Sequence, residues 1–116
     1  MTAPPPDTGG PLVTTDWSSS GDRCILTVSG DLDATAAPAL GRCLLDVLAR
    51  SGVREVELDL RRVGFLDSAG LTTLVVAHQT AQRTGQSLGM RCGTNRAVLR
   101  PMGITGLSTV FTVVDG

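Results

Sequence analysis

The sequence predicts a single α/β domain built on a mostly parallel sheet of four to five strands, with an antiparallel hairpin at its N-terminal edge. Three observations predict this fold. The chain has 116 residues, the size of one domain. Two β-rich segments precede the first helix and are separated by a short polar turn. Strand and helix patterns then alternate in the overall order ββαβαβαβ, which is typical of parallel sheets with right-handed crossovers.

The chain is expected to begin with a disordered tail over residues 1–11 and to fold over residues 12–116. The tail is rich in Pro, Gly and Thr and buries too little apolar surface to offset the entropy of ordering. A first strand is expected over Leu12–Trp17 and a second over Arg23–Ser29. The polar residues 18–22 are turn formers and join these strands into a hairpin.

The first helix is expected after a loop over Gly30–Ala34, with Thr35 as its N-cap. Pro38 falls in the first turn, where its missing N–H costs little. The Ser51-Gly52 pair is expected to end the helix. The apolar residues that recur at helical spacing, and so form its buried face, are Leu40, Leu44, Val47 and Leu48.

The second half of the chain repeats this alternation. A strand over Val53–Leu60 has charged residues between most of its apolar ones, and a turn over Phe65–Gly70 leads into a second helix that ends near Gly85. The apolar stripe of that helix holds Leu71, Leu74, Val75 and His78. The last elements are a strand over Ser87–Cys92, a helix over Asn95–Met102 and a strand over Val110–Val114. Thr94 or Asn95 is expected to start this helix, and Gly103 to stop it.

Composition excludes several classes of function. All ten basic residues are arginine, so a Walker A phosphate loop and a Schiff-base enzyme, which both need lysine, are excluded. The net charge of -1 offers no basic footprint for non-specific binding of nucleic acid. No apolar run is long enough to span a membrane, and residues 1–11 lack the features of a signal peptide, so a cytoplasmic protein without membrane insertion is expected. The three cysteines, Cys24, Cys43 and Cys92, are expected to be buried apolar residues.

Two loops are expected to meet where the parallel strands end, which is where such sheets place their sites. They are Gly30–Thr35 and Leu66–Gly70. Ser68 then lies at the start of a helix, where free N–H groups and the helix dipole favour an anion such as a phosphate group. The residues alone leave open the simpler reading, in which Asp67 and Ser68 only cap the helix. For Asp31 and Asp33, loop solvation and helix capping compete equally with a binding role.

No catalytic site, metal site or cofactor is expected. A serine hydrolase needs a His base near Ser68, but His78, the only histidine, lies ten residues along the same helix, or roughly 15 Å away. Four carboxylates could converge at one end of the sheet, as in receiver domains that bind Mg²⁺. Receiver domains also use a lysine, which this chain lacks. The four carboxylates are Asp31, Asp33, Asp59 and Asp67.

Three segments make the chain resemble the STAS domain, and in particular bacterial anti-sigma factor antagonists. They are Gly30-Asp31-Leu32-Asp33, then Phe65-Leu66-Asp67-Ser68-Ala69-Gly70-Leu71, and Thr105-Gly106-Leu107 ahead of Val110-Phe111. The resemblance runs from about Leu12 to Val114.

The resemblance implies a regulatory protein rather than an enzyme. Unphosphorylated family members bind a GHKL-type serine kinase that doubles as an anti-sigma factor, and so release the sigma factor. The kinase phosphorylates the serine after the motif aspartate, which is Ser68 here, and a PP2C-type phosphatase reverses this. The resemblance places the partner-binding surface at Asp31, Asp33, Thr35, Asp67, Ser68, Ala69, Gly70 and Thr72.

The chain departs from the family pattern in three places. Ala69 replaces a second hydroxyl residue, and Asp31 replaces the usual Glu. Many relatives continue into a final helix beyond the position of Gly116, and its absence would expose part of one sheet face. Two other functions stay open. The first is a STAS scaffold or regulatory subunit of a larger complex, such as a transporter, in which Ser68 only caps a helix. The second is an enzyme that binds or hydrolyses nucleotides. The second is disfavoured because the chain has no Gly-rich phosphate loop.

Overall fold

The expected order of strands and helices is confirmed by the structure, a computed structural model that describes residues 12–105 and 112–114. The predicted tail over residues 1–11 lies outside the described residues, as do Val110 and Phe111. The elements in chain order are β1 (Leu12–Trp17), β2 (Arg23–Leu32), α1 (Ala37–Ala49), β3 (Glu55–Leu66), α2 (Ser68–Arg83), β4 (Ser87–Arg91), α3 (Arg96–Thr105) and β5 (Thr112–Val114).

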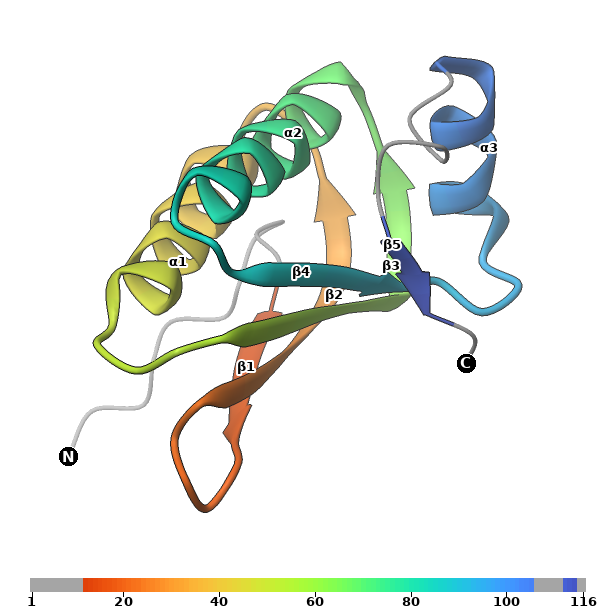
Figure 1. The fold of residues 1–116 in the computed structure, drawn as a ribbon. Coiled ribbons are helices and arrows are strands. Elements are labelled where there is room, and N and C mark those ends of the chain that lie inside the picture. Colours follow the sequence, from red (N-terminus) through yellow and green to blue (C-terminus); the bar gives the residue numbers. More distant parts are fainter. Residues whose placement is uncertain (1–11, 106–111, 115–116) are drawn as a thin grey trace, which may run out of the picture.

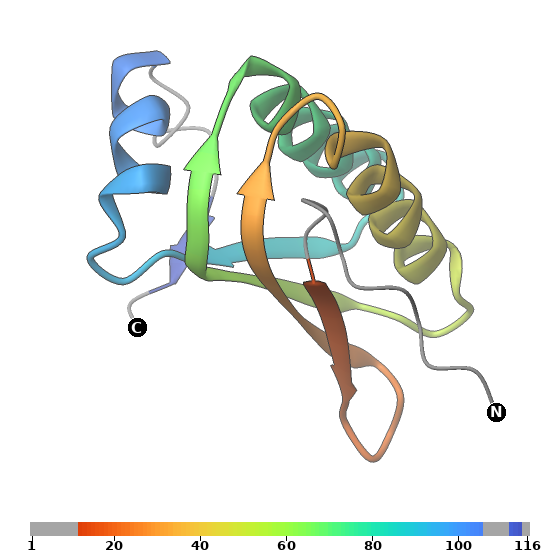
Figure 2. The ribbon, with the colours of Figure 1, turned by 180° about the vertical axis from the view of Figure 1, so that it is seen from behind.

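The strands form one mixed sheet in the order β1-β2-β3-β4-β5. β1 runs antiparallel to β2, and every other neighbouring pair is parallel. The predicted N-terminal hairpin and mostly parallel sheet are therefore confirmed. Figure 1 shows α1 and α2 side by side over one face of this sheet, while α3 lies apart from them beside the end of β3. Figure 2 shows the same arrangement from behind.

The core lies between the sheet and the two neighbouring helices. The predicted face of α1 is buried, and Leu26, Leu58 and Met90 on three successive strands are fully covered. Cys24 and Cys92 belong to this core, and Cys43 packs against it. Their expected role as buried apolar residues is confirmed for Cys24 and Cys92, whereas Cys43 is half-buried. Burial raises the pKa of all three thiols, which favours the protonated thiol over the more reactive thiolate.

The two central strands are longer than the sequence predicts, and this lengthening builds the site. Residues 30–32, expected in a loop, continue β2, and residues 61–66, of which 65 and 66 were expected in a turn, continue β3. Beyond Asp59, β3 pairs only with β2, because β4 ends at Arg91 opposite Asp59. Figure 1 shows β3 turning upward after it leaves β4. The register between β2 and β3 shifts twice at this bend, between residues 27 and 29 and between residues 30 and 31.

Asn95, the residue before α3, holds this bend in place. Its side-chain amide donates hydrogen bonds to the carbonyl oxygens of Leu60 and Val63, both at 2.8 Å, and of Arg61 at 3.2 Å. These carbonyls belong to the part of β3 that has no β4 neighbour. Its side-chain oxygen accepts the N–H of Ala97, which confirms Asn95 as a starting residue of the third helix. The predicted stop at Gly103 is wrong, because α3 continues to Thr105.

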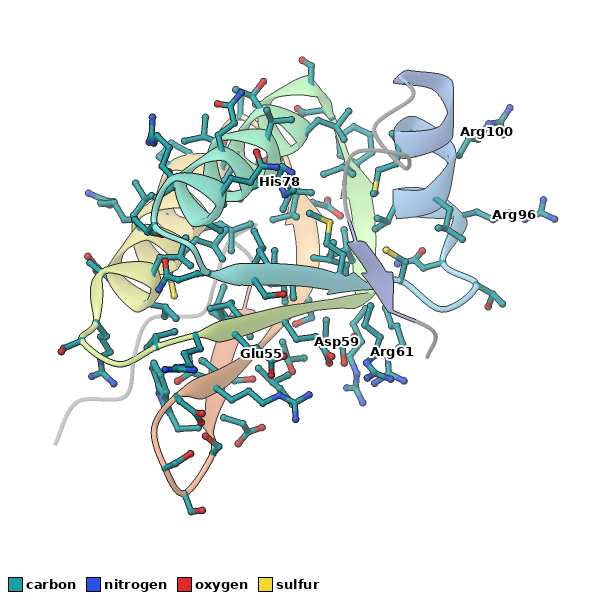
Figure 3. The ribbon with its side chains drawn as sticks, in the orientation of Figure 1. Glu55, Asp59, Arg61, His78, Arg96 and Arg100 are labelled. Carbon is teal, nitrogen blue, oxygen red and sulfur yellow. The ribbon has the colours of Figure 1, made fainter. Side chains whose placement is uncertain are left out.

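The sheet face opposite α1 and α2 carries charged side chains. Figure 3 shows Glu55, Asp59 and Arg61 on this side of β3. Asp59 pairs with Arg61 at 2.8 Å, and Glu57 pairs with Arg91 of β4 at 3.0 Å. Both carboxylates are buried beneath these arginines, at 8% and 9% exposure. The charged residues that alternate along this strand therefore lie on one polar face that satisfies its own charges.

Candidate functional site

The two predicted site loops meet at the end of the long central strands. Leu32 and Leu66, the last residues of β2 and β3, are register partners. The N–H of Asp67 donates to the carbonyl oxygen of Leu32 at 3.2 Å, so the turn into α2 lies directly against the end of β2. The first turn of α2 packs equally closely, because a Cβ added to Gly70 would lie 2.5 Å from that same oxygen.

Asp67 is the N-cap of α2. Its backbone is extended, and its Oδ1 atom accepts the N–H groups of Ala69 at 2.9 Å and Gly70 at 3.0 Å. Its carbonyl oxygen accepts the N–H of Leu71. The expectation of free N–H groups at this helix start is therefore wrong for residues 69 and 70, because the Asp67 side chain already accepts both N–H groups.

Ser68 is the first residue of α2, and its side chain is exposed. Its hydroxyl forms no hydrogen bond with any residue that the structure describes. Its carbonyl oxygen instead accepts the hydroxyl of Thr72, one turn later, at 2.8 Å. Ser68 therefore presents an accessible hydroxyl on a capped helix start, beside a carboxylate that is held in place by backbone donors.

The loop after β2 is held by Asp33 rather than by Thr35. Asp33 Oδ1 accepts the N–H groups of Thr35 at 3.1 Å and Ala36 at 3.0 Å. The N-cap of α1 is Ala36, which makes no side-chain cap. The predicted Thr35 N-cap is therefore wrong, because the chain makes an extra turn centred on Asp33 before the helix begins. Thr35 is exposed, and Asp31, on the last part of β2, is exposed as well.

A groove of about 430 Å³ lies beside Ser68, between the end of β3 and α3. We call it the Phe65 groove, since Phe65 is half exposed. The groove is lined by Gly64, Phe65, Leu66, Asp67, Ser68, Leu71, Arg96, Ala97, Arg100 and Pro101. Sequence reasoning missed the contribution of α3. The available signal was that α3 carries two arginines and no acidic residue, but only the fold brings them to this groove.

Among the described residues, the structure does not bring together the side chains that a Ser68 hydrolase or a receiver-type site would need. His78 is half-buried on α2, more than two turns beyond Ser68. Asp59, one of the four carboxylates that were considered together, lies in the middle of the sheet and pairs with Arg61. Within the described ranges, no three His, Cys, Asp or Glu side chains gather closely enough to hold a metal ion. Nor is any helix in those ranges long and apolar enough to cross a membrane.

Comparison with known proteins identifies a family and a fold. Residues 15–115 match the family described as "Mlab, STAS domain". The anti-sigma-B factor antagonist of Listeria monocytogenes is 30% identical to this chain over 92 residues, which is 79% of each protein.

Solved structures show the same fold. An anti-sigma factor antagonist from Mycobacterium paratuberculosis superposes with a TM-score of 0.76 and 28% identity, over 90% of this chain and 87% of its own. The Bacillus cell fate determinant SpoIIAA in its phosphorylated form gives a TM-score of 0.67 over 89% of this chain and 91% of its own. At 12% identity, the SpoIIAA likeness is one of fold alone.

Proposed function

Because the chain belongs to the STAS domain family, we propose that it is an anti-sigma factor antagonist that is switched by phosphorylation of Ser68. In its unphosphorylated form it binds a GHKL-type serine kinase that doubles as an anti-sigma factor, and the sigma factor is released. Phosphorylation ends this binding, and a PP2C-type phosphatase restores it. The activity named for the Listeria monocytogenes relative supports the general role.

The observation that carries the proposal is the state of the Ser68 side chain. Its hydroxyl is exposed and unused by the described part of the fold, while its neighbour Asp67 has already capped the helix. Phosphorylation therefore breaks no side-chain hydrogen bond of Ser68 within that part. Transfer of the γ-phosphoryl group of ATP to Ser68 Oγ releases ADP and a proton, and leaves a group with about -1.5 to -2 charges on the surface.

The same cap explains how the phosphate would act. Asp67 Oδ1 already accepts the N–H groups of Ala69 and Gly70. These two groups would therefore not bind the phosphate. It would project towards the partner as added bulk and negative charge. Like charge at a close interface costs several kcal/mol, which corresponds to a large loss of affinity.

The proposed partner-binding surface divides into contact residues and supporting residues. Asp31, Thr35, Ser68 and Thr72 are exposed and available for direct contact. The supporting residues hold these in place: Asp33 by accepting the N–H groups of Thr35 and Ala36, Asp67 by capping α2, Ala69 through its N–H to Asp67, and Gly70 through its close packing. In this role the chain itself catalyses no reaction. Because the switch depends on ATP and on a sigma factor, the proposed site of action is the cytoplasm.

Mass spectrometry and binding measurements test the switch. The GHKL-type kinases encoded in the same genome are purified and incubated with this protein and ATP. We expect one of them to bind the unphosphorylated protein and to add one phosphate at Ser68. The Ser68→Ala variant should stay bound in the presence of ATP, and Ser68→Asp should bind about 100-fold more weakly or worse.

Ser19→Asp supplies the control, because Ser19 is exposed in the turn of the β1–β2 hairpin, which Figure 1 shows well away from α2, and the substitution adds the same charge. It should bind like the unchanged protein. Equal affinity of the phosphorylated and unphosphorylated proteins would contradict the switch. The absence of any phosphate adduct would instead support a STAS scaffold in which Ser68 only begins a helix.

A further inference from the structure

We propose that the Phe65 groove binds an acidic segment of the partner that inserts an apolar side chain next to its carboxylates. This inference rests on the proposed function and extends the partner's footprint from the start of α2 across to α3. The inference rests on the shape and apolar character of the groove and on the charge of α3. It also rests on the position of Ser68, which lines the same groove.

The apolar part of the site is Phe65. It is half exposed, the most exposed large apolar side chain among the described residues. Leu71 and Pro101 line the groove with it, from α2 and α3 respectively. The volume of about 430 Å³ can accept a large apolar side chain. An exposed aromatic side chain at the edge of a groove is the kind of residue that anchors protein interfaces.

The charged part of the site is α3. Arg96 and Arg100 line the groove and are exposed, and Figure 3 shows both extending outward from the helix. Neither forms an ion pair or a side-chain hydrogen bond within the described part of the chain. Arg96 is the first residue of α3. A positive charge at the start of a helix interacts unfavourably with the helix dipole, so Arg96 does not stabilise α3 through its charge.

Charge complementarity therefore favours an acidic occupant. The whole chain has a net charge of -1, yet the two arginines outnumber the single carboxylate of the lining, Asp67, whose Oδ1 already accepts two backbone N–H groups. Arginine pairs well with carboxylates. Ser68 lines the same groove, so a phosphate there would repel the acidic segment and compete with it for the arginines. This supplies a physical route from phosphorylation to release.

The test measures the affinity of groove variants for the kinase identified above, at low and high salt. Arg96→Gln with Arg100→Gln should weaken binding about tenfold at low salt and flatten its salt dependence, because screening acts on the charge pairs. Phe65→Ala should weaken binding about tenfold or more and leave the salt dependence unchanged. Arg54→Gln with Arg83→Gln, which removes two exposed arginines away from the groove, should bind like the unchanged protein.

A photo-crosslink identifies the occupant. With p-benzoylphenylalanine in place of Phe65, we expect a crosslink to a partner segment that contains Asp or Glu. A crosslink to a neutral or basic segment would overturn the proposal, as would unchanged affinity of the groove variants. A loss for Leu45→Ala, on the exposed surface of α1, with none for Phe65→Ala would also overturn it. If no GHKL-type kinase binds the unchanged protein, the proposed function fails. If a kinase binds the unchanged protein and the groove variants with equal affinity, only this inference is refuted.

Discussion

At the scale of single residues, Gly70 shows most directly how the site depends on close packing. A Cβ at this position would lie 2.5 Å from the carbonyl oxygen of Leu32 and 2.6 Å from Cδ1 of Leu66. The backbone of Gly70 does not adopt a positive φ. Space, rather than conformational freedom, therefore requires glycine here. Without it, the first turn of α2 could not lie against the ends of both central strands, and Ser68 would shift.

We expect Gly70→Ala to lower the free energy of unfolding by about 1–3 kcal/mol, because the added methyl group overpacks a site whose nearest atoms include backbone. Urea denaturation measures this. Gly103→Ala is the matched control, since a Cβ there meets nothing within 4 Å. It should leave stability unchanged or raise it by up to about 1 kcal/mol through helix propensity. Equal stability of the two variants would contradict the packing argument.

At the scale of elements, the bend of β3 and the start of α3 form one unit. β3 continues beyond the end of β4, and Asn95 supplies the donors that a neighbouring strand would otherwise provide. This contact also fixes where α3 begins, and so where Arg96 and Arg100 stand relative to Phe65. The hydrogen bonds of Asn95, which join residues more than thirty positions apart, therefore act together with the buried Val98 and Met102 of α3 to position one wall of the Phe65 groove.

Replacement of Asn95 should loosen this unit. Asn95→Ala is expected to lower the free energy of unfolding by about 1–3 kcal/mol, because part-buried carbonyl oxygens of β3 lose their donor. Asn95→Asp keeps an oxygen for the N–H of Ala97 but cannot donate while ionised. If the hydrogen bonds to β3 contribute more stability than the bond from the N–H of Ala97, both variants will have a lower free energy of unfolding in urea than the unchanged protein. A stable Asn95→Asp protein would show that only the cap contributes.

At the scale of the whole molecule, the sheet separates an apolar face from a charged one. The apolar face is covered by α1 and α2, whereas the other face balances its buried carboxylates with arginines from the same sheet. Hydrogen bonds from Arg61 hold the pKa of Asp59 below its ordinary value of 3.8. The fold therefore favours the ionised form of this carboxylate.

The stability of the protein should consequently fall at acidic pH. A carboxylate with a depressed pKa in the folded state stabilises the fold above its unfolded pKa, and this stabilisation is lost as pH falls through the folded value. We expect Asp59→Asn to cost about 1 kcal/mol at pH 7, after allowance for the half-exposed Arg61. The difference from the unchanged protein should shrink below about pH 4. A difference that stays constant from pH 7 to pH 3, measured by urea denaturation, would contradict the assignment to Asp59.

Much of the fold could be predicted because its signals are local. The hairpin, the buried face of α1 and the parallel order of strands follow from turn residues and from apolar periodicity. The meeting of the two site loops also followed, since the carboxyl ends of parallel strands share one edge of the sheet. The N-cap of α1 was missed, because Thr35 is a good capping residue, whereas the chain makes an extra turn at Asp33 and the helix begins after Ala36, which has no capping side chain.

Local sequence patterns were enough to predict that Asp67 and Ser68 stand at the start of a helix after a strand, because strand pattern, capping chemistry and helical spacing act over a few residues. The tertiary structure alone decided that β2 and β3 extend to Leu32 and Leu66, and that α3 places two arginines beside Phe65. Strand length depends on which neighbour remains available for pairing, and a groove depends on contacts between residues about thirty positions apart. Neither the length of a strand nor the position of a groove can be predicted from the local sequence patterns that predict helices and strands.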